Sequence, residues 1–521
     1  MGDASMDTTF ALLPPAPAHN PVKQATARAN ELGEKQIATT LGYFATMPAS
    51  TGIIANPVLH HTPVECNGTT ITLDIRSFTI RGIIPEADIV RGDAGPIDVI
   101  FTGLFSGAPE QAGTSSAAKE KLAALIDQKY FESLGTREDR SFNAGPLVEE
   151  IAGFVKKYPG LGPEVAIQYF AALAKARAGR EEHQEHGVHD DRDALSLLME
   201  MISLHLRNVA VGGVSTYMNY VVTNNPQIGE KDLAASANDF IAAEVSEGRN
   251  AFQISYSLIL GRHANEHERL ILERMGTIQI HHGSAGSSMV ARYMATLHTL
   301  STSDFFVASQ MALDGARHFG AIHDMTDFVQ ELEAMPAATR ADRIREKMLG
   351  GGLPTFGHPE IAAAGRGNQV QQDPRPAIYI DPVFKAIDAG KLTMSPRQRE
   401  RLAIARLIYL TAFVNGVLKP DRANEPPLRL TANTDFGAWC VQEALGIEEP
   451  DRTLLTYIFR GFGWMMDARE QLQQKMIRPV IAPDPQIIPK SSDDPTIPTL
   501  VERVHRRLSH EKDPFSAQPS D

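Results

Sequence analysis

Apolar residues recur at three- and four-residue spacing along most of the chain from about Ala117 onward, a pattern typical of helices with one buried face. Helical runs are predicted over 232–247, 286–300, 302–316, 396–416 and 452–475. Short stretches of Gly, Pro and Asn separate these runs, and no unit of about 20 to 50 residues repeats. The pattern predicts a mainly α-helical protein that is not a solenoid.

Strand-like alternation is found in one region near the N-terminus. Asn67-Gly68, a strong hairpin turn signal, precedes alternating residues from Thr70 to Ile75 and an apolar stretch from Phe78 to Ile84. We therefore expect a small β hairpin near 67–84. Residues 1–55, rich in Ala, Pro and Thr, are predicted to be an N-terminal extension, and residues 481–521 a C-terminal tail.

The composition is that of a folded protein with an acidic balance. Of 521 residues, 43% are hydrophobic and 22% charged, and 50 Lys and Arg against 63 Asp and Glu give a net charge of −13. This charge argues against nucleic acid and anionic membranes as partners. The only cysteines, Cys66 and Cys440, indicate a reducing compartment. With no export signal and no apolar run of about 20 residues, we expect a cytoplasmic protein without a membrane span.

Two local clusters suggest chemistry without defining it. Residues 181–191 are rich in His, Asp and Glu, but their spacing fits no defined metal site, and a solvated loop between helices explains the same composition. We therefore expect no metal. Gly350 to His358 reads GGGLPTFGH, which allows close backbone approach to a ligand. The segment matches neither the P-loop nor the dinucleotide fingerprint.

Several short motifs occur in one order that resembles the citrate synthase family. That family carries an early LDIRS, then DHE, a helix, PLHGGAN, GxGH, DPR, NVD, an Arg before GW, and RP. The corresponding pieces here are Leu73-Asp74-Ile75-Arg76-Ser77, His281-His282, Arg317-His318-Phe319-Gly320-Ala321, Gly357-His358, Asp373-Pro374-Arg375, Asn433-Thr434-Asp435, Arg460-Gly461-Phe462-Gly463-Trp464 and Ile477-Arg478-Pro479. No single piece is decisive, but their ordered occurrence over residues 60 to 480 is far more specific.

The resemblance implies a two-domain helical fold that acts as a homodimer or a higher homo-oligomer. A large domain would comprise residues 56–319 and 447–480, and a small domain residues 320–446. Substrates would bind between the two domains, and closure would exclude water. In family members the arginine matching Arg478 reaches across the dimer interface.

The resemblance also implies condensation of an acyl-CoA with a 2-oxo acid. Asp435 would remove a proton from the carbon next to the thioester, and His318 would stabilise the enol oxygen. His358 would polarise the ketone of the 2-oxo acid. The substrate-binding residues would be His282, Arg375, Arg460 and Arg478, whose guanidinium groups suit carboxylates. Acyl-CoA is a substrate and no cofactor is permanently bound; CoA would lie along Thr355, Phe356, Gly357 and Asn433.

Each of these residues also has an ordinary structural explanation. Asp435 could cap the helix that begins near Phe436, and this is the favoured interpretation of the local sequence alone. His318 could be a hydrogen-bonded core histidine. Arg460 and Arg478 could be salt-bridge partners. All of these explanations would have to hold at once, so we favour a working site.

The chain departs from the family pattern around the two histidine motifs. Gln279, His281 and Gly283 replace the family's His, Asp and Glu, and Ala285 and Gly286 stand where its Asn follows. Ile322 replaces the Asn of HGGAN. An insertion within 361–372, with Ala362–Gly367 at its centre, lengthens the distance from His358 to Arg375 and is predicted to loop outward.

The reaction expected from the resemblance is acetyl-CoA, oxaloacetate and water giving citrate and CoA, the entry reaction of the tricarboxylic acid cycle. A 2-methylcitrate or other alkylcitrate synthase is the nearest alternative, because one methylene changes binding by only about 1 to 3 kcal/mol. A catalytically silent scaffold or regulatory relative is an alternative of another class. Cleavage of citryl-CoA by the same site is a third.

Overall fold

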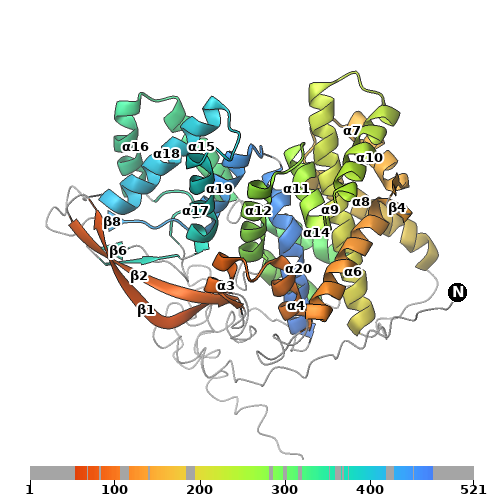
Figure 1. Cartoon of the computed structure of the whole chain (residues 1–521), viewed down its shortest axis with the longest axis horizontal. Helices are drawn as coiled ribbons and strands as arrows, with labels where there is room; N and C mark the ends of the chain where they lie inside the picture. Colours follow the sequence, from red (N-terminus) through yellow and green to blue (C-terminus); the bar gives the residue numbers. More distant parts are fainter. Residues whose placement is uncertain are drawn as a thin grey trace, which may run out of the picture. The chain divides into compact units, whose positions relative to one another are not determined.

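The computed structural model describes residues 53–472 except 67–68, 81–83, 106–115, 139–140, 183–193, 281–285, 297–301, 315–319, 351, 358–364, 367–368, 374, 418–427 and 450. All the described residues belong to one compact unit. Helices form most of it (Figure 1), so the prediction of a mainly α fold with a small N-terminal β region is confirmed.

The helices follow one another along the chain with short connections. They are α3 (Glu86–Arg91), α4 (Pro96–Phe105), α6 (Ser116–Leu134), α7 (Pro146–Lys157), α8 (Pro163–Glu182), α9 (Ala194–Asn224), α10 (Glu230–Ser246), α11 (Ala251–Leu260), α12 (Glu266–Gln279), α13 (Gly286–Thr296), α14 (Thr302–Leu313), α15 (Gly320–Glu333), α16 (Ala337–Leu349), α17 (Arg375–Asp388), α18 (Pro396–Tyr409), the π-helix η1 (Leu410–Asn415), α19 (Thr434–Leu445) and α20 (Arg452–Leu472). The five predicted helical runs coincide with α10, α13, α14, α18 followed by η1, and α20 within a few residues, as far as the described residues extend.

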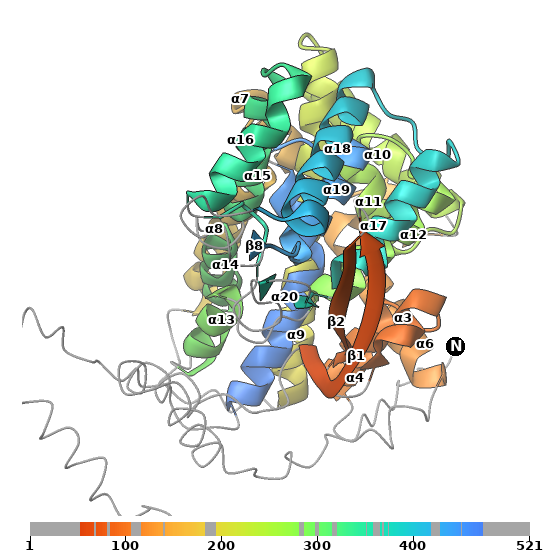
Figure 2. The same cartoon turned by 90° about the vertical axis from the view of Figure 1, so that its left-hand side faces the viewer.

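The described strands form two sheets. They are β1 (Ile53–Cys66), β2 (Thr69–Ile80), β3 (Ile84–Pro85), β4 (Gly135–Glu138), β5 (Ser141–Ala144), β6 (Gly365–Arg366), β7 (Gln369–Gln372) and β8 (Leu428–Arg429). The larger sheet has the order β1-β2-β7-β6-β8, with β3 on β2, and β4 pairs with β5. Strands β1 and β2 form the long antiparallel ribbon of Figure 2. The predicted hairpin is present. Its first strand, β1, precedes the predicted turn at Asn67-Gly68, and these two turn residues lie outside the described residues.

The expectation that the inserted segment loops outward is wrong for its described residues. Strand β7 pairs in parallel with β2, and β6 pairs with both β7 and β8. Small residues argued for an exposed loop, but a sheet edge satisfies backbone groups whatever side chains the segment carries. The insertion is therefore hydrogen-bonded to the N-terminal hairpin. Strands β6 and β7 are too short to show an alternation of apolar and polar residues in the sequence.

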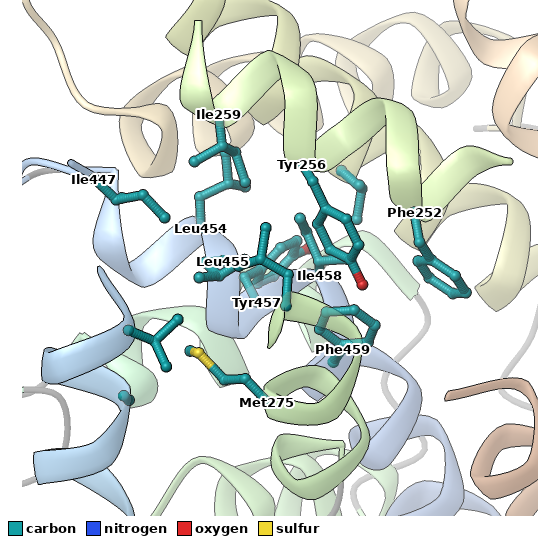
Figure 3. Packing of buried hydrophobic residues seen from close by; sticks show 14 of the residues in the cluster. Phe252, Tyr256, Ile259, Met275, Ile447, Leu454, Leu455, Tyr457, Ile458 and Phe459 are labelled. Carbon is teal, nitrogen blue, oxygen red and sulfur yellow. The ribbon is translucent and has the colours of Figure 1, made fainter. Parts of the chain in front are cut away.

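Helix α20 is buried on almost every side by the surrounding helices. It contacts α4, α9, α11, α12, α13 and α14. Figure 3 shows its apolar side chains against α11. The ring centroid of Phe459 lies 5.2 Å from that of Phe252 and 6.0 Å from that of Tyr256. Because packing fixes how the helix is rotated, the polar side chains that α20 carries have fixed positions.

Helix α9 corrects the expectation that no segment is apolar enough to span a membrane. Its residues Leu197–Asn224 have a mean hydropathy of 1.2 over the most apolar window, and 67% of that window is buried in the protein. Helices α6, α7, α8, α11 and α20 all contact α9. A helix that is apolar all round belongs in the core when other helices enclose it, as they do here.

A buried polar network joins α20 to α15, α18 and α19. Glu443 accepts hydrogen bonds from Arg452 at 3.0 Å and from Arg401 at 3.2 Å. Arg452 also donates to the hydroxyl of Thr326 at 2.8 Å, which accepts from the Trp439 indole at 3.0 Å. Both guanidinium groups lie within 6 Å of the Trp439 ring centroid, at 5.8 and 5.9 Å. One carboxylate thus compensates two buried cations.

Replacing this carboxylate is expected to be strongly destabilising. Glu443→Gln leaves Arg401 and Arg452 buried without a full counter-charge, which should lower the free energy of unfolding by about 3 to 5 kcal/mol. Thermal and urea unfolding measure the loss. The control is Glu331→Gln, which removes an exposed ion pair with Arg343 and should cost under about 1 kcal/mol. Equal losses in the two variants would contradict this account.

Candidate functional site

Two segments far apart in the sequence meet at the start of α19. Residues 355–357 run antiparallel to residues 431–433, with a bridge between Phe356 and Ala432. The Gly357 N–H donates to the Thr431 carbonyl at 2.8 Å, and the Asn433 N–H donates to the Thr355 carbonyl at 3.0 Å. The GxGH-like segment is therefore fixed to the segment that leads into Asp435.

The N-cap of α19 is Asn433, so the interpretation of Asp435 as the cap is wrong. The side-chain oxygen of Asn433 accepts from the backbone N–H groups of Asp435, at 2.8 Å, and of Phe436, at 3.3 Å. Asp435 itself lies in the first turn, where a carboxylate interacts favourably with the helix dipole. Its carboxyl group is left available for chemistry.

The segment before His358 has an unusual backbone. Thr355 has a φ of 62°, and no other described non-glycine residue has a positive φ. Gly357 has a φ of 80°. In the family's GxGH pattern the first glycine stands where this chain has Thr355. Thr355 therefore adopts the left-handed conformation that glycine adopts most easily.

Arg375 is held rigidly by the acidic residue of its own motif. Its Nε and Nη2 donate to the Asp373 carboxylate, at 2.9 and 2.7 Å to the nearer oxygens, and its backbone N–H donates to the same group at 3.0 Å. Both side chains are fully buried. The role of Asp373 was not recognised in the sequence, although its position two residues before Arg375 in DPR was the available signal.

The first turn of α19 packs directly on α17, the helix that begins at Arg375. The Tyr379 hydroxyl donates to the Thr434 carbonyl at 2.6 Å. A Cβ at Gly437 would lie 2.4 Å from the Tyr379 ring, so only glycine permits this approach. The close contact brings Arg375 and Asp435 into one site, as the resemblance implies, but the contact of Tyr379 with Gly437 that achieves this has no signal in the sequence.

Asp435 lies among buried charges of both signs. Burial raises the pKa of its carboxyl to about 6, while the positive charges of Arg375 and Arg460 oppose the rise and the negative charge of Asp373 adds to it. A carboxyl group that is largely ionised at neutral pH, yet more basic than in water, is suited to removing a proton.

Arg460 supplies a cation with free hydrogen-bond donors. It projects from α20 and is 4% exposed, and its Nε and Nη1 have no hydrogen-bond partner among the described residues. Burial lowers its pKa to about 10, opposed by the negative charges of Asp435 and Asp467. In the described part of the chain Arg460 forms no ion pair, so the salt-bridge interpretation finds no support there. A buried guanidinium with unused donors suits an anionic ligand.

Four predicted site residues lie outside the described residues: His282, His318, His358 and Arg478. Gln279 and Ile322, which depart from the family pattern, lie within the described residues. The side-chain oxygen of Gln279 accepts from the Thr456 hydroxyl at 3.0 Å, and Ile322 is fully buried in the core. Within the described ranges no three His, Cys, Asp or Glu residues are grouped to hold a metal ion. The His-rich segment is not described beyond residue 182.

These features define a helical protein in which a buried guanidinium group acts on a carboxyl group of raised pKa. A sequence model of one family, described as citrate synthase, C-terminal domain, matches residues 145–480. The chain therefore belongs to the citrate synthase family.

Solved structures are similar in fold. The citrate synthase of Pyrobaculum aerophilum gives a TM-score of 0.51 at 16% identity, over 81% of this chain and 89% of that one. The citrate synthase of Thermoplasma acidophilum, solved in a ternary complex with carboxymethyl coenzyme A and oxaloacetate, gives 0.49 at 15% identity, over 81% and 92%. No curated protein sequence matches this chain.

The raised pKa of Asp435 predicts how charge at this position affects stability. The folded-state pKa, about 6, lies above the ordinary 3.8, so the native state binds the proton more tightly and stability falls as pH rises between these values. Asp435→Asn should therefore unfold at a higher temperature than the wild type at pH 8, with a free energy of unfolding larger by up to about 3 kcal/mol, the equivalent of about two pKa units. The difference should disappear near pH 4.

Thermal unfolding across this pH range tests the expectation. Asp342→Asn, which alters an exposed carboxylate on α16, is the control and should follow the wild type throughout. An Asp435→Asn variant less stable than the wild type at pH 8 would show that the ionised carboxylate is net stabilising.

Proposed function

We propose that this chain condenses an acyl-CoA with a 2-oxo acid, most simply acetyl-CoA with oxaloacetate and water to give citrate and CoA. The observation that carries the proposal is the juxtaposition of Asp435 with Arg460, a buried cation that has two unused N–H donors. Membership of the citrate synthase family supports the same reaction.

Proton removal from the acyl-CoA falls to Asp435. Its carboxylate takes a proton from the carbon next to the thioester, and the electron pair of that C–H bond forms the enolate. Its pKa of about 6 leaves it ionised at neutral pH. By the resemblance, His318 would stabilise the enol oxygen.

The 2-oxo acid would be held by the arginines. Arg460 offers N–H donors at Nε and Nη1, each of which can donate to an oxygen of an anionic substrate. Arg375, already paired with Asp373, adds its positive charge from a fixed position. The enolate carbon attacks the ketone carbon, a C–C bond forms, and the ketone oxygen takes a proton, which the resemblance assigns to His358. That residue follows Gly357, which is fixed beside Asn433. Water then hydrolyses the thioester and releases CoA.

A longer acyl group is the second candidate. The positions that flank His282 and His318 differ from the family, with Gln279 bonded to Thr456 and Ile322 in the core. These differences adjoin the region assigned to the substrates, so propionyl-CoA, which would give 2-methylcitrate, is the natural comparison.

CoA release from oxaloacetate with acetyl-CoA or propionyl-CoA tests the function. The wild type should turn over at least one of the two, and Asp435→Asn should lose activity by about a hundredfold or more, because it removes the base. Asp342→Asn should retain full activity. Turnover that persists in Asp435→Asn would refute the base assignment, and no turnover by the wild type would favour the silent scaffold.

We also propose a homodimer formed through α8, α13 and α14. Large apolar residues are exposed on all three helices: Val165 at 36% and Tyr169 at 48% on α8, Tyr293 at 44% on α13 and Met311 at 61% on α14. Helix α14 contacts both of the others. Exposed apolar side chains gathered on neighbouring helices are typical of protein interfaces.

Light scattering after gel filtration tests the dimer. The wild type should have twice the chain mass, and Met311→Asp should shift it towards the monomer, because a charge would be buried at the interface. Leu349→Asp, on the exposed end of α16, should leave the mass unchanged. A monomeric wild type, or a dimeric Met311→Asp variant, would refute this interface.

A further inference from the structure

The side chain of Asn433 uses both ends of its amide. Its oxygen accepts from the backbone N–H groups of Asp435, at 2.8 Å, and of Phe436, at 3.3 Å. Its nitrogen donates to the Gly357 carbonyl at 3.1 Å. The residue is 8% exposed, so these bonds form where water scarcely competes.

Capping a helix uses only the oxygen of the Asn side chain and does not require its nitrogen. Ser395 caps α18 with its hydroxyl oxygen, which accepts from the Gln398 N–H at 3.2 Å, and Asn250 caps α11 by accepting from Gln253 at 3.0 Å. At position 433 a serine could fulfil the capping role but is too short to reach Gly357 as well. The amide adds a link from the helix end to the neighbouring strand.

The link joins the two segments that carry the proposed chemistry. Asp435 lies two residues after Asn433, and His358 directly follows Gly357 in the sequence. The same segments are already paired through the backbone of Thr355 and Thr431. The amide thus fixes the start of α19 relative to the last residue before His358.

We propose that Asn433 is a positioning residue that sets Asp435 in register with the Gly357–His358 segment, in place of the acyl-CoA contact that the family resemblance implies. The inference rests on the proposed function for its kinetic consequence. The structural part, a side chain that holds two segments together, can be tested without activity.

Three variants test the capping role of the amide oxygen separately from the linking role of the amide nitrogen. Asn433→Ala removes the cap and the link, whereas Asn433→Ser keeps a capping oxygen and removes only the link. Asn250→Ala is the matched control, because it removes the same type of cap from α11, outside the site. The melting temperature should fall further in Asn433→Ala, which loses the cap and the link, than in Asn250→Ala, which loses only a cap, or in Asn433→Ser, which loses only the link.

Kinetics should separate positioning from capping and from CoA binding. Both Asn433 variants should lose kcat by roughly tenfold to a hundredfold, because a displacement near 1 Å between reacting groups has that effect. Their KM for the acyl-CoA should stay within about twofold of the wild type, and Asn250→Ala should keep its kcat. A raised KM for the acyl-CoA with an unchanged kcat would overturn the proposal in favour of a CoA contact.

Hydrogen exchange measured by mass spectrometry supplies the readout that needs no turnover. Asn433→Ser should increase exchange in peptides covering 352–357 while the start of α19 stays protected, and Asn433→Ala should increase it in both. Wild-type exchange over 352–357 in both variants would overturn the link. If the wild type shows no condensation, the proposed function fails, and the exchange result still decides whether Asn433 joins the two segments.

Discussion

The burial of the Arg460 guanidinium is the constraint on which the rest of the site depends. A buried guanidinium with two unpartnered donors costs several kcal/mol of solvation, and the fold must offset this cost elsewhere. The compensation comes from α20, whose apolar side chains are buried on all sides against at least six other helices. Since that packing fixes the rotation of the helix, Arg460 cannot turn to solvent. With a pKa of about 10 it remains protonated at neutral pH.

The two arginines of the site are treated differently by their surroundings. Arg375 is paired with Asp373, which holds it rigid and offsets part of the cost of burying its charge. Among the described residues, Nε and Nη1 of Arg460 have no hydrogen-bond partner. If both arginines were paired with carboxylates, their pull on an anionic ligand would be weaker; if neither were, the cost of burying them would be greater. The pKa of Asp435 reflects both effects. Desolvation raises it, and the attraction of the two cations offsets only part of that rise.

Much of the fold could be predicted from the sequence, because helices such as α10 and α20 follow from local apolar spacing. Helix α9 is different. Because it is apolar on every side, its composition alone cannot distinguish a buried core helix from a helix that spans a membrane. The ordered motifs assign Asp435, Arg375 and Arg460 to one site, and in the structure the charges of the two arginines act on Asp435. The sequence could not show that Asn433 rather than Asp435 caps α19, since Asn and Asp cap almost equally well. Nor could it show the pairing of Arg375 with Asp373 or the pairing of β7 with β2, which depend on how distant segments meet.

Thr355 stands where the GxGH pattern has its first glycine. Its φ is 62°, and a β-branched residue in this conformation costs about 1 to 2 kcal/mol. The strain persists because the carbonyl of Thr355 is held by the Asn433 N–H and the next residues pair with 431–432. Two residues further on, the Gly357 carbonyl accepts from the Asn433 amide. A residue-by-residue comparison of GxGH records a mismatch at Thr355, but this chain has both a left-handed backbone at that position and the contact of Gly357 with the start of α19.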